Sequence, residues 1–172
     1  MNIRKAEITD AEAITNVHVK TWQSAYRGLI SDEILDNIDY NKRYNLWNDV
    51  LSEDKEDSFL YVAEVNEKIV GFLSGGPSRT EDMDYKGEIY GFYILPVYQR
   101  QGIGQELFNR AVKFFLNRNI NSMLIWVLKG NPAINFYKKM GGKRLQKADI
   151  EISGERYTEI SFGWENLRNP RS

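Results

Sequence analysis

The sequence has no cysteine and a single histidine, and these absences remove several kinds of chemistry. Without thiols there is no disulfide, no cysteine nucleophile and no thiolate metal site. One imidazole does not make a metal centre, so we expect no bound metal ion. The lack of cysteine also fits a reducing compartment, and we expect the protein to be cytoplasmic.

Net charge is nearly absent as well. The 23 basic residues balance the 24 acidic ones to a formal charge of −1, which gives no overall attraction to nucleic acid or to an anionic membrane. No apolar run approaches the length of a membrane span, and the first residues form no signal-peptide core. We therefore expect a soluble protein without nucleic-acid or membrane partners. Its 172 residues contain no linker or repeat, which predicts a single domain over residues 1–172.

The sequence does contain a regular succession of helical and strand patterns. Apolar residues at helical spacing predict helices over residues 11–26, 31–38, 40–51, 105–118 and 132–140. Alternating or apolar runs predict strands over residues 1–7, 59–65, 69–74, 88–95, 122–128, 143–152 and 156–164. Gly75-Gly76-Pro77 is expected to end the third of these strands. This order favours an α/β (α+β) fold, a mixed sheet with helices on both faces.

The stretch from Glu88 to Leu107 is the most informative part of the chain. A strand stopped by Pro96 is followed by a glycine-containing turn and then by a helix. The first N–H groups of that helix have no intrahelical partners and carry the positive end of the helix dipole, so the junction suits an anion. Two glycines alone do not settle this, because a plain connecting turn uses them too. The turn also lacks the third glycine of a dinucleotide-binding loop and the Gly-Lys-Ser/Thr ending of a P-loop.

The whole string Gln99-x-x-Gly102-x-Gly104 resembles motif A of the GCN5-related N-acetyltransferases. The segment 131–141, Asn-Pro-Ala-Ile-Asn-Phe-Tyr-Lys-Lys-Met-Gly, is similar to a second block of that family, and the order of elements matches over nearly the whole chain. The resemblance implies the acyl-CoA N-acyltransferase fold, in which the central sheet is mostly antiparallel. Many members have phenylalanine where this chain has Gly142, and we expect looser packing there.

The resemblance also assigns residues to acetyl-CoA. In the family, the motif A turn binds the pyrophosphate of the cofactor, which here gives Gln99, Arg100, Gln101, Gly102, Ile103 and Gly104. The strand before the turn splays from its neighbour and its backbone bonds the pantetheine arm, at Tyr93, Ile94 and Leu95. Asn131 is expected both to cap the following helix and to contact the pantetheine region.

Two side chains are implied in the chemistry. Tyr137 occupies the position of the tyrosine that protonates the departing sulfur, although a buried aromatic with a hydrogen-bonded hydroxyl would look the same in sequence. Glu88 occupies the strand on which many relatives carry the base that takes a proton from the amine, directly or through water. An exposed glutamate without a role is the alternative.

The acceptor is the least defined part of the prediction. Trp22 and Tyr26 lie where the family places its variable substrate wall, and the acidic loop containing Glu81, Asp82 and Asp84 would attract a cation or simply be solvated. His18 lies off the apolar stripe of its helix, which favours a surface or structural role.

We expect an N-acetyltransferase acting on a primary amine of a small molecule or of a peptide or protein, and the resemblance allows a homodimer. The alternative is a non-catalytic acyl-CoA-binding or regulatory module.

Overall fold

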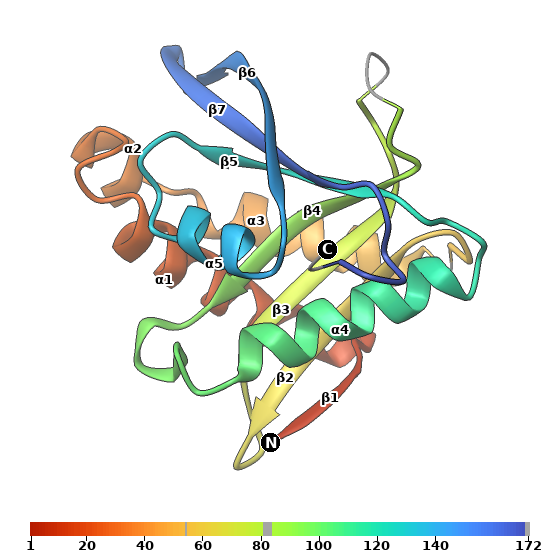
Figure 1. Ribbon diagram of the computed structural model, residues 1–172. Helices are drawn as coiled ribbons and strands as arrows, with labels where there is room; N and C mark the ends of the chain where they lie inside the picture. Colours follow the sequence, from red (N-terminus) through yellow and green to blue (C-terminus); the bar gives the residue numbers. More distant parts are fainter. Residues whose placement is uncertain (54, 81–83, 171–172) are drawn as a thin grey trace.

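The structure is a computed structural model that describes residues 1–53, 55–80 and 84–170 (Figure 1). Its strands are β1 (Asn2–Lys5), β2 (Phe59–Val65), β3 (Lys68–Pro77), β4 (Gly87–Ile94), β5 (Met123–Leu128), β6 (Lys143–Ile152) and β7 (Glu155–Trp164). Its helices are α1 (Ala11–Ala25), α2 (Asp32–Asp36), α3 (Tyr40–Ser52), α4 (Ile103–Leu116) and α5 (Ala133–Lys139), with short 3-10 turns at Ile8–Asp10 and Pro96–Tyr98. Every predicted helix and strand is present.

The strands form one sheet in the order β1-β2-β3-β4-β5-β7-β6. All neighbouring strands run antiparallel except β4 and β5, which are parallel. This confirms the expected mixed, mostly antiparallel sheet. The parallel pair requires a crossover connection, and α4 supplies it.

Helices cover both faces of the sheet (Figure 1). On one face, α4 buries an apolar stripe that includes Leu107, Phe108 and Phe115. On the other face, α1 and α3 bury a second cluster that includes Val17 and Trp47. The site described below lies where residues from these two layers meet.

The prediction that Gly75-Gly76-Pro77 ends β3 is wrong. Gly76 pairs with Glu88 and Pro77 pairs with Gly87, so the strand continues through all three residues. A β-carbon at Gly75 would lie 2.6 Å from both the Glu88 carbonyl oxygen and the Phe59 ring. Glycine is present because the strands approach closely, rather than because the chain turns.

The pairing between β4 and β5 is very short. Only Gly87, Glu88 and Ile89 pair with β5, opposite Met123, Leu124 and Ile125, and the two strands then diverge (Figure 1). On its other edge β4 is bulged at Tyr90, because the register moves from Ser74↔Gly91 to Gly75↔Ile89. The edge of β4 that faces β5 therefore has no strand partner beyond Ile89, as the predicted splay requires.

The expected loose packing at Gly142 is also wrong. A β-carbon there would lie 2.8 Å from the Trp164 ring and 3.0 Å from the Tyr137 carbonyl oxygen. Trp164 is 2% exposed, and its indole N–H donates to the Met140 carbonyl at 2.9 Å. The indole of β7 fills the space that a phenylalanine at position 142 would occupy, and the site is close-packed.

Candidate active site

The turn between β4 and α4 is built as an anion cradle. Arg100 and Gly102 both have positive φ, 59° and 85°, and Gly102 is the N-cap of α4. In the described part of the chain, the backbone N–H groups of residues 100–104 donate to no carbonyl and to no side chain. Successive unpartnered amides at the start of a fourteen-residue helix favour a phosphate group.

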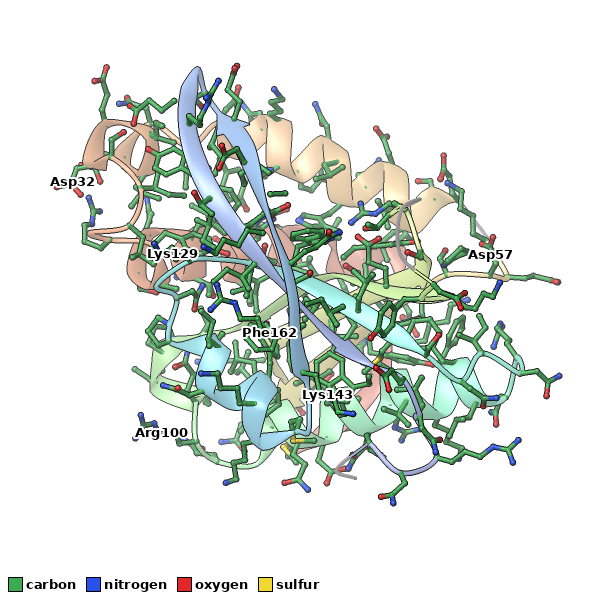
Figure 2. The ribbon with its side chains drawn as sticks, turned by 45° about the horizontal axis from the view of Figure 1, so that its top comes forward. Asp32, Asp57, Arg100, Lys129, Lys143 and Phe162 are labelled. Carbon is green, nitrogen blue, oxygen red and sulfur yellow. The ribbon has the colours of Figure 1, made fainter. Side chains whose placement is uncertain are left out.

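Two glutamine side chains hold this turn in shape. Gln99 donates its side-chain amide to the Ile94 carbonyl at 2.9 Å, and Gln101 donates to the Val97 carbonyl at 2.9 Å. Their side chains therefore brace the loop, and the prediction that both residues bind the cofactor now concerns their backbone groups. Arg100 projects from the loop at the edge of the molecule (Figure 2), where it is exposed.

The two glycines of the motif have different structural roles. No atom lies within 4 Å of a β-carbon built on Gly102, so the space above it is open to a ligand. A β-carbon at Gly104 would lie 3.3 Å from the Phe136 ring and 3.4 Å from Ile94. Gly104 therefore permits close packing of α4 against α5 and β4, and Gly102 leaves the cradle accessible.

Tyr137 approaches the splay from α5. Its ring packs among aromatic residues of the α4 face, including Phe92, Phe162 and Trp164, and the residue is 4% exposed. Its hydroxyl forms no hydrogen bond with a residue that the structure describes. Burial raises the pKa of Tyr137, with a smaller contribution from Tyr93, so the hydroxyl keeps its proton at neutral pH.

Side chains from both faces of the sheet meet at this hydroxyl. Tyr26, at the C-cap of α1, lies close to Tyr93 of β4, to Tyr137 and to Asn131. Burial raises the pKa of Tyr26 first, and the neighbouring Tyr93 and Tyr137 raise it further. Asn131 also accepts a hydrogen bond from the Ala133 N–H at 2.8 Å, so it caps α5 as predicted. The splay thus connects the α4 layer with the α1 layer.

Glu88 is buried, in contrast to the exposed glutamate of the alternative interpretation. It is 3% exposed, and its carboxylate accepts hydrogen bonds from Arg79 Nη2 at 2.6 Å, Arg79 Nε at 3.1 Å and the Arg79 backbone N–H at 2.7 Å. The Arg79 side chain is 62% exposed and stacks on the Tyr90 ring at 3.9 Å. The carboxylate is fixed, and the group that covers it lies at the surface.

A second carboxylate, Glu159 of β7, was missed. It pairs with Leu128 across β5 and β7, on the α1 face of the sheet, and its side chain makes no ion pair or hydrogen bond with a described residue. Burial raises the pKa of Glu159, and the nearby charge of Glu88 adds to the effect. Because side chains alternate along a strand, the sequence already places Glu159 on the same face of β7 as Tyr157. This alternation could have identified Glu159.

A cavity of about 830 Å³ opens on the α1 side of β4. Its inner wall is formed by His18, Trp22, Arg43, Trp47 and Tyr93. The predicted substrate residue Trp22 therefore lines this cavity, and its ring stands at right angles to that of Tyr26 with 5.0 Å between centroids. Of the surface or structural role expected for His18, the surface alternative is wrong, because α1 turns this residue inward and leaves it 5% exposed.

Of the three acidic residues that were considered for the acceptor, Glu81 and Asp82 lie outside the described residues, and Asp84 is exposed. Within residues 1–53, 55–80 and 84–170, no group of three His, Asp or Glu side chains is placed to hold a metal ion. Over the same residues, no helix combines the length and apolar character needed to cross a bilayer.

A seven-stranded sheet with a splayed parallel pair and an anion cradle beside the splay is the architecture of the acyl-CoA N-acyltransferases. Residues 18–142 match the Acetyltransferase (GNAT) family, and the chain belongs to this family of acyltransferases.

Similarity to named proteins agrees with this assignment. The uncharacterized N-acetyltransferase YuaI of Bacillus subtilis is 33% identical over 97% of this chain and 94% of its own length. The spermidine N(1)-acetyltransferase of Thermoplasma acidophilum is 26% identical over 83% of this chain and 88% of its own. A crystal structure of the PaiA N-acetyltransferase from Thermoplasma acidophilum in complex with coenzyme A superposes with a TM-score of 0.70 at 23% identity, covering 92% of this chain and 96% of that one.

Proposed function

We propose that this chain, as one domain over residues 1–172, transfers an acetyl group from acetyl-CoA to the primary amine of a small molecule or of a peptide. The observation that carries the proposal is the row of unpartnered N–H groups at residues 100–104, beside a splay that the buried Tyr137 approaches from α5. A fold neighbour has been crystallised with coenzyme A, which supports the choice of donor.

The donor fits the groups that are present. The amides of residues 100–104 would bind the pyrophosphate, since charge-assisted hydrogen bonds to backbone N–H groups suit an anion held at a helix N-terminus. The pantetheine arm would lie along the unpaired edge of β4 near Tyr93, Ile94 and Leu95, where it would replace the missing strand partner.

The reaction is written as a direct attack. The neutral amine forms a C–N bond with the thioester carbonyl carbon, and the C–S bond breaks to release the thiolate. Tyr137 donates its proton to that sulfur, and the amine loses a proton to a base, so the products are the amide and free coenzyme A. The raised pKa of Tyr137 ensures that the hydroxyl holds the proton it must give.

Glu88 is proposed as the base, directly or through water. Its carboxylate becomes available when the exposed Arg79 side chain moves away from it. Glu159 is the second candidate, because its carboxylate has a raised pKa and no partner among the described residues, so it accepts a proton without any such displacement.

A non-catalytic acyl-CoA-binding module is the other functional class. The test is a thiol-release assay with acetyl-CoA and a panel of amines that includes spermidine, with coenzyme A affinity measured by calorimetry in parallel. Turnover with at least one amine supports the acetyltransferase. Coenzyme A binding without turnover on any amine would assign the chain to the binding module instead.

A further inference from the structure

The inner end of the 830 Å³ cavity presents hydrogen-bond donors without acceptors. Trp47 donates its indole N–H to His18 Nδ1 at 3.0 Å, so in the neutral imidazole the hydrogen is on Nε2. Burial lowers the pKa of His18 to about 3, and the nearby Arg43 charge contributes, so the ring is neutral at physiological pH. His18 Nε2–H is therefore a fixed donor.

Neither of the two ring N–H groups at this end has a hydrogen-bond partner. His18 Nε2 and Trp22 Nε1 are buried and form no hydrogen bond with the described residues. The Tyr93 hydroxyl lies near the Trp22 N–H, but the two groups are not in hydrogen-bonding geometry. A buried donor without an acceptor is energetically unfavourable. Both nitrogens have almost no accessible surface, so an oxygen atom of a ligand in the cavity becomes their partner when a neighbouring side chain moves.

Arg43 supplies the positive charge. Its guanidinium lies over the Trp22 ring, 4.9 Å from the centroid, and it forms no ion pair with any residue that the structure describes. It is close enough to affect the pKa values of both His18 and Tyr93. Arg43 thus belongs to the cavity wall and lies near Tyr93 of the tyrosine cluster.

The other charges around the cavity are already paired or lie at its rim. Arg79 is bound to Glu88, and Lys55 is bound to Glu53 at 2.5 Å. Lys5, Glu7 and Asp57 also line the cavity and are exposed; Figure 2 shows Asp57 at the edge of the molecule. The unpaired charge at the inner end is therefore positive, and the neutral groups beside it are N–H donors.

We propose that the acceptor is a small amine that also carries a carboxylate, and that Arg43 binds this carboxylate with the N–H groups of His18 and Trp22 beside it. This inference rests on the proposed acetyltransferase function and narrows its acceptor. A planar guanidinium matches a carboxylate through two parallel hydrogen bonds. One arginine with neutral donors suits a monoanion better than a phosphate dianion. A polyamine, which has no anion to offer, would place positive charge against Arg43.

The experiment measures kcat/KM by thiol release for matched acceptors that differ only in the anionic group. Each of leucine, γ-aminobutyrate and 6-aminohexanoate is compared with its own carboxamide, and phosphoethanolamine and spermidine complete the set. We expect at least one carboxylate to exceed its amide by about tenfold, the value of a charge-assisted hydrogen bond. Equal rates for every acid and its amide, or a preference for phosphoethanolamine or spermidine, would overturn the proposal.

Variants of Arg43 test the residue itself. R43Q should lower kcat/KM for the preferred carboxylate by about tenfold and change that of its amide much less, while R43K should retain part of the preference. K42Q, on the adjacent exposed residue of α3, is the matched control and should keep the wild-type preference. If R43Q lowers kcat/KM equally for the acid and its amide while the melting temperature is unchanged, Arg43 does not recognise the carboxylate.

The same data separate this inference from the function on which it rests. If no amine is acetylated although coenzyme A binds, the acetyltransferase proposal fails. If amines are acetylated without regard to a carboxylate, the function stands and the acceptor assignment fails.

Discussion

The two halves of the proposed site use different kinds of chemical group, backbone amides in one and side chains in the other. The proposed donor half, on the α4 side, consists of backbone amides in the loop at residues 100–104 and of an unpaired strand edge. The proposed acceptor half, on the α1 side, consists of side chains from separate elements, such as Trp22 and Arg43 at the cavity and Glu88 on β4. Backbone N–H groups are present whatever the side chains are, whereas side-chain groups depend on the residue at each position. The proposed donor half therefore depends on chain geometry, and the proposed acceptor half depends on residue identity.

The largest expected effect tests whether the donor half depends on backbone geometry. Gly102→Leu should weaken coenzyme A binding by about 1,000-fold, because the side chain fills the open space over several charge-assisted N–H donors. Calorimetry measures the affinity.

Gly154→Leu is the matched control for this variant. Gly154 has φ 86° and equally open surroundings in the β6–β7 turn. Both substitutions force a side chain into the left-handed region at a cost of about 1–2 kcal/mol. Equal loss of binding in the two variants would show that strain, rather than the cradle, is responsible.

Tyr137→Phe tests the proposed general acid, which lies where the two halves of the site meet. We expect kcat to fall by about 100-fold, since the proton for the departing sulfur is lost, while coenzyme A affinity stays close to that of the wild type. The phenylalanine ring retains the aromatic packing of the residue. Single-turnover kinetics measure the chemical step, and an unchanged rate would make Tyr137 a packing residue only.

Glu88→Gln and Glu159→Gln sharpen the description of the acceptor half. The variant that removes the base should lower kcat/KM by at least about tenfold and lose the acid limb of the pH profile. E88Q should also lower the melting temperature, because Arg79 loses its partner. A normal pH profile in E88Q together with an altered one in E159Q would transfer the role of base to Glu159.

The smallest effect concerns stability. His18 has a folded pKa of about 3, below the ordinary value of 6.5, so between these values the unfolded chain binds a proton that the folded chain does not. Stability is then lost as pH falls from 6.5, by about 2 kcal/mol between pH 7 and pH 5. Urea titrations of wild type and His18→Gln at both pH values should differ by that amount. The same pH dependence in both proteins would mean that His18 is accessible to protons.

The donor half could be predicted from the sequence because it depends on local order. A strand, a turn with Gly102 and an amphipathic helix specify unpartnered amides wherever the rest of the chain lies. The wrong predictions concern glycines that are required by residues far away in the sequence. Gly75 and Gly142 look like breaks or gaps in sequence, but each accommodates a ring, Phe59 and Trp164 respectively, from a distant strand.

The residues of the proposed acceptor half could be predicted from the sequence only in part. Trp22 and Tyr26 were predicted from their place in the family pattern, but Arg43, Arg79 and Glu159 come from α3, from the segment after β3 and from β7. No spacing in the sequence relates these residues to one another. Their proximity is a product of tertiary packing, so a sequence pattern alone does not predict it.

The three paired residues that join β4 to β5 have a consequence for how the protein responds to its ligand. They divide the hydrogen-bonded ladder into β1–β4 and β5–β7–β6, with a seam between them. A ligand lying along that seam would contact strands of both groups and hold them together. Ligand occupancy should therefore slow amide hydrogen exchange on the inner edges of β4 and β5, and raise the unfolding temperature in step with ligand concentration.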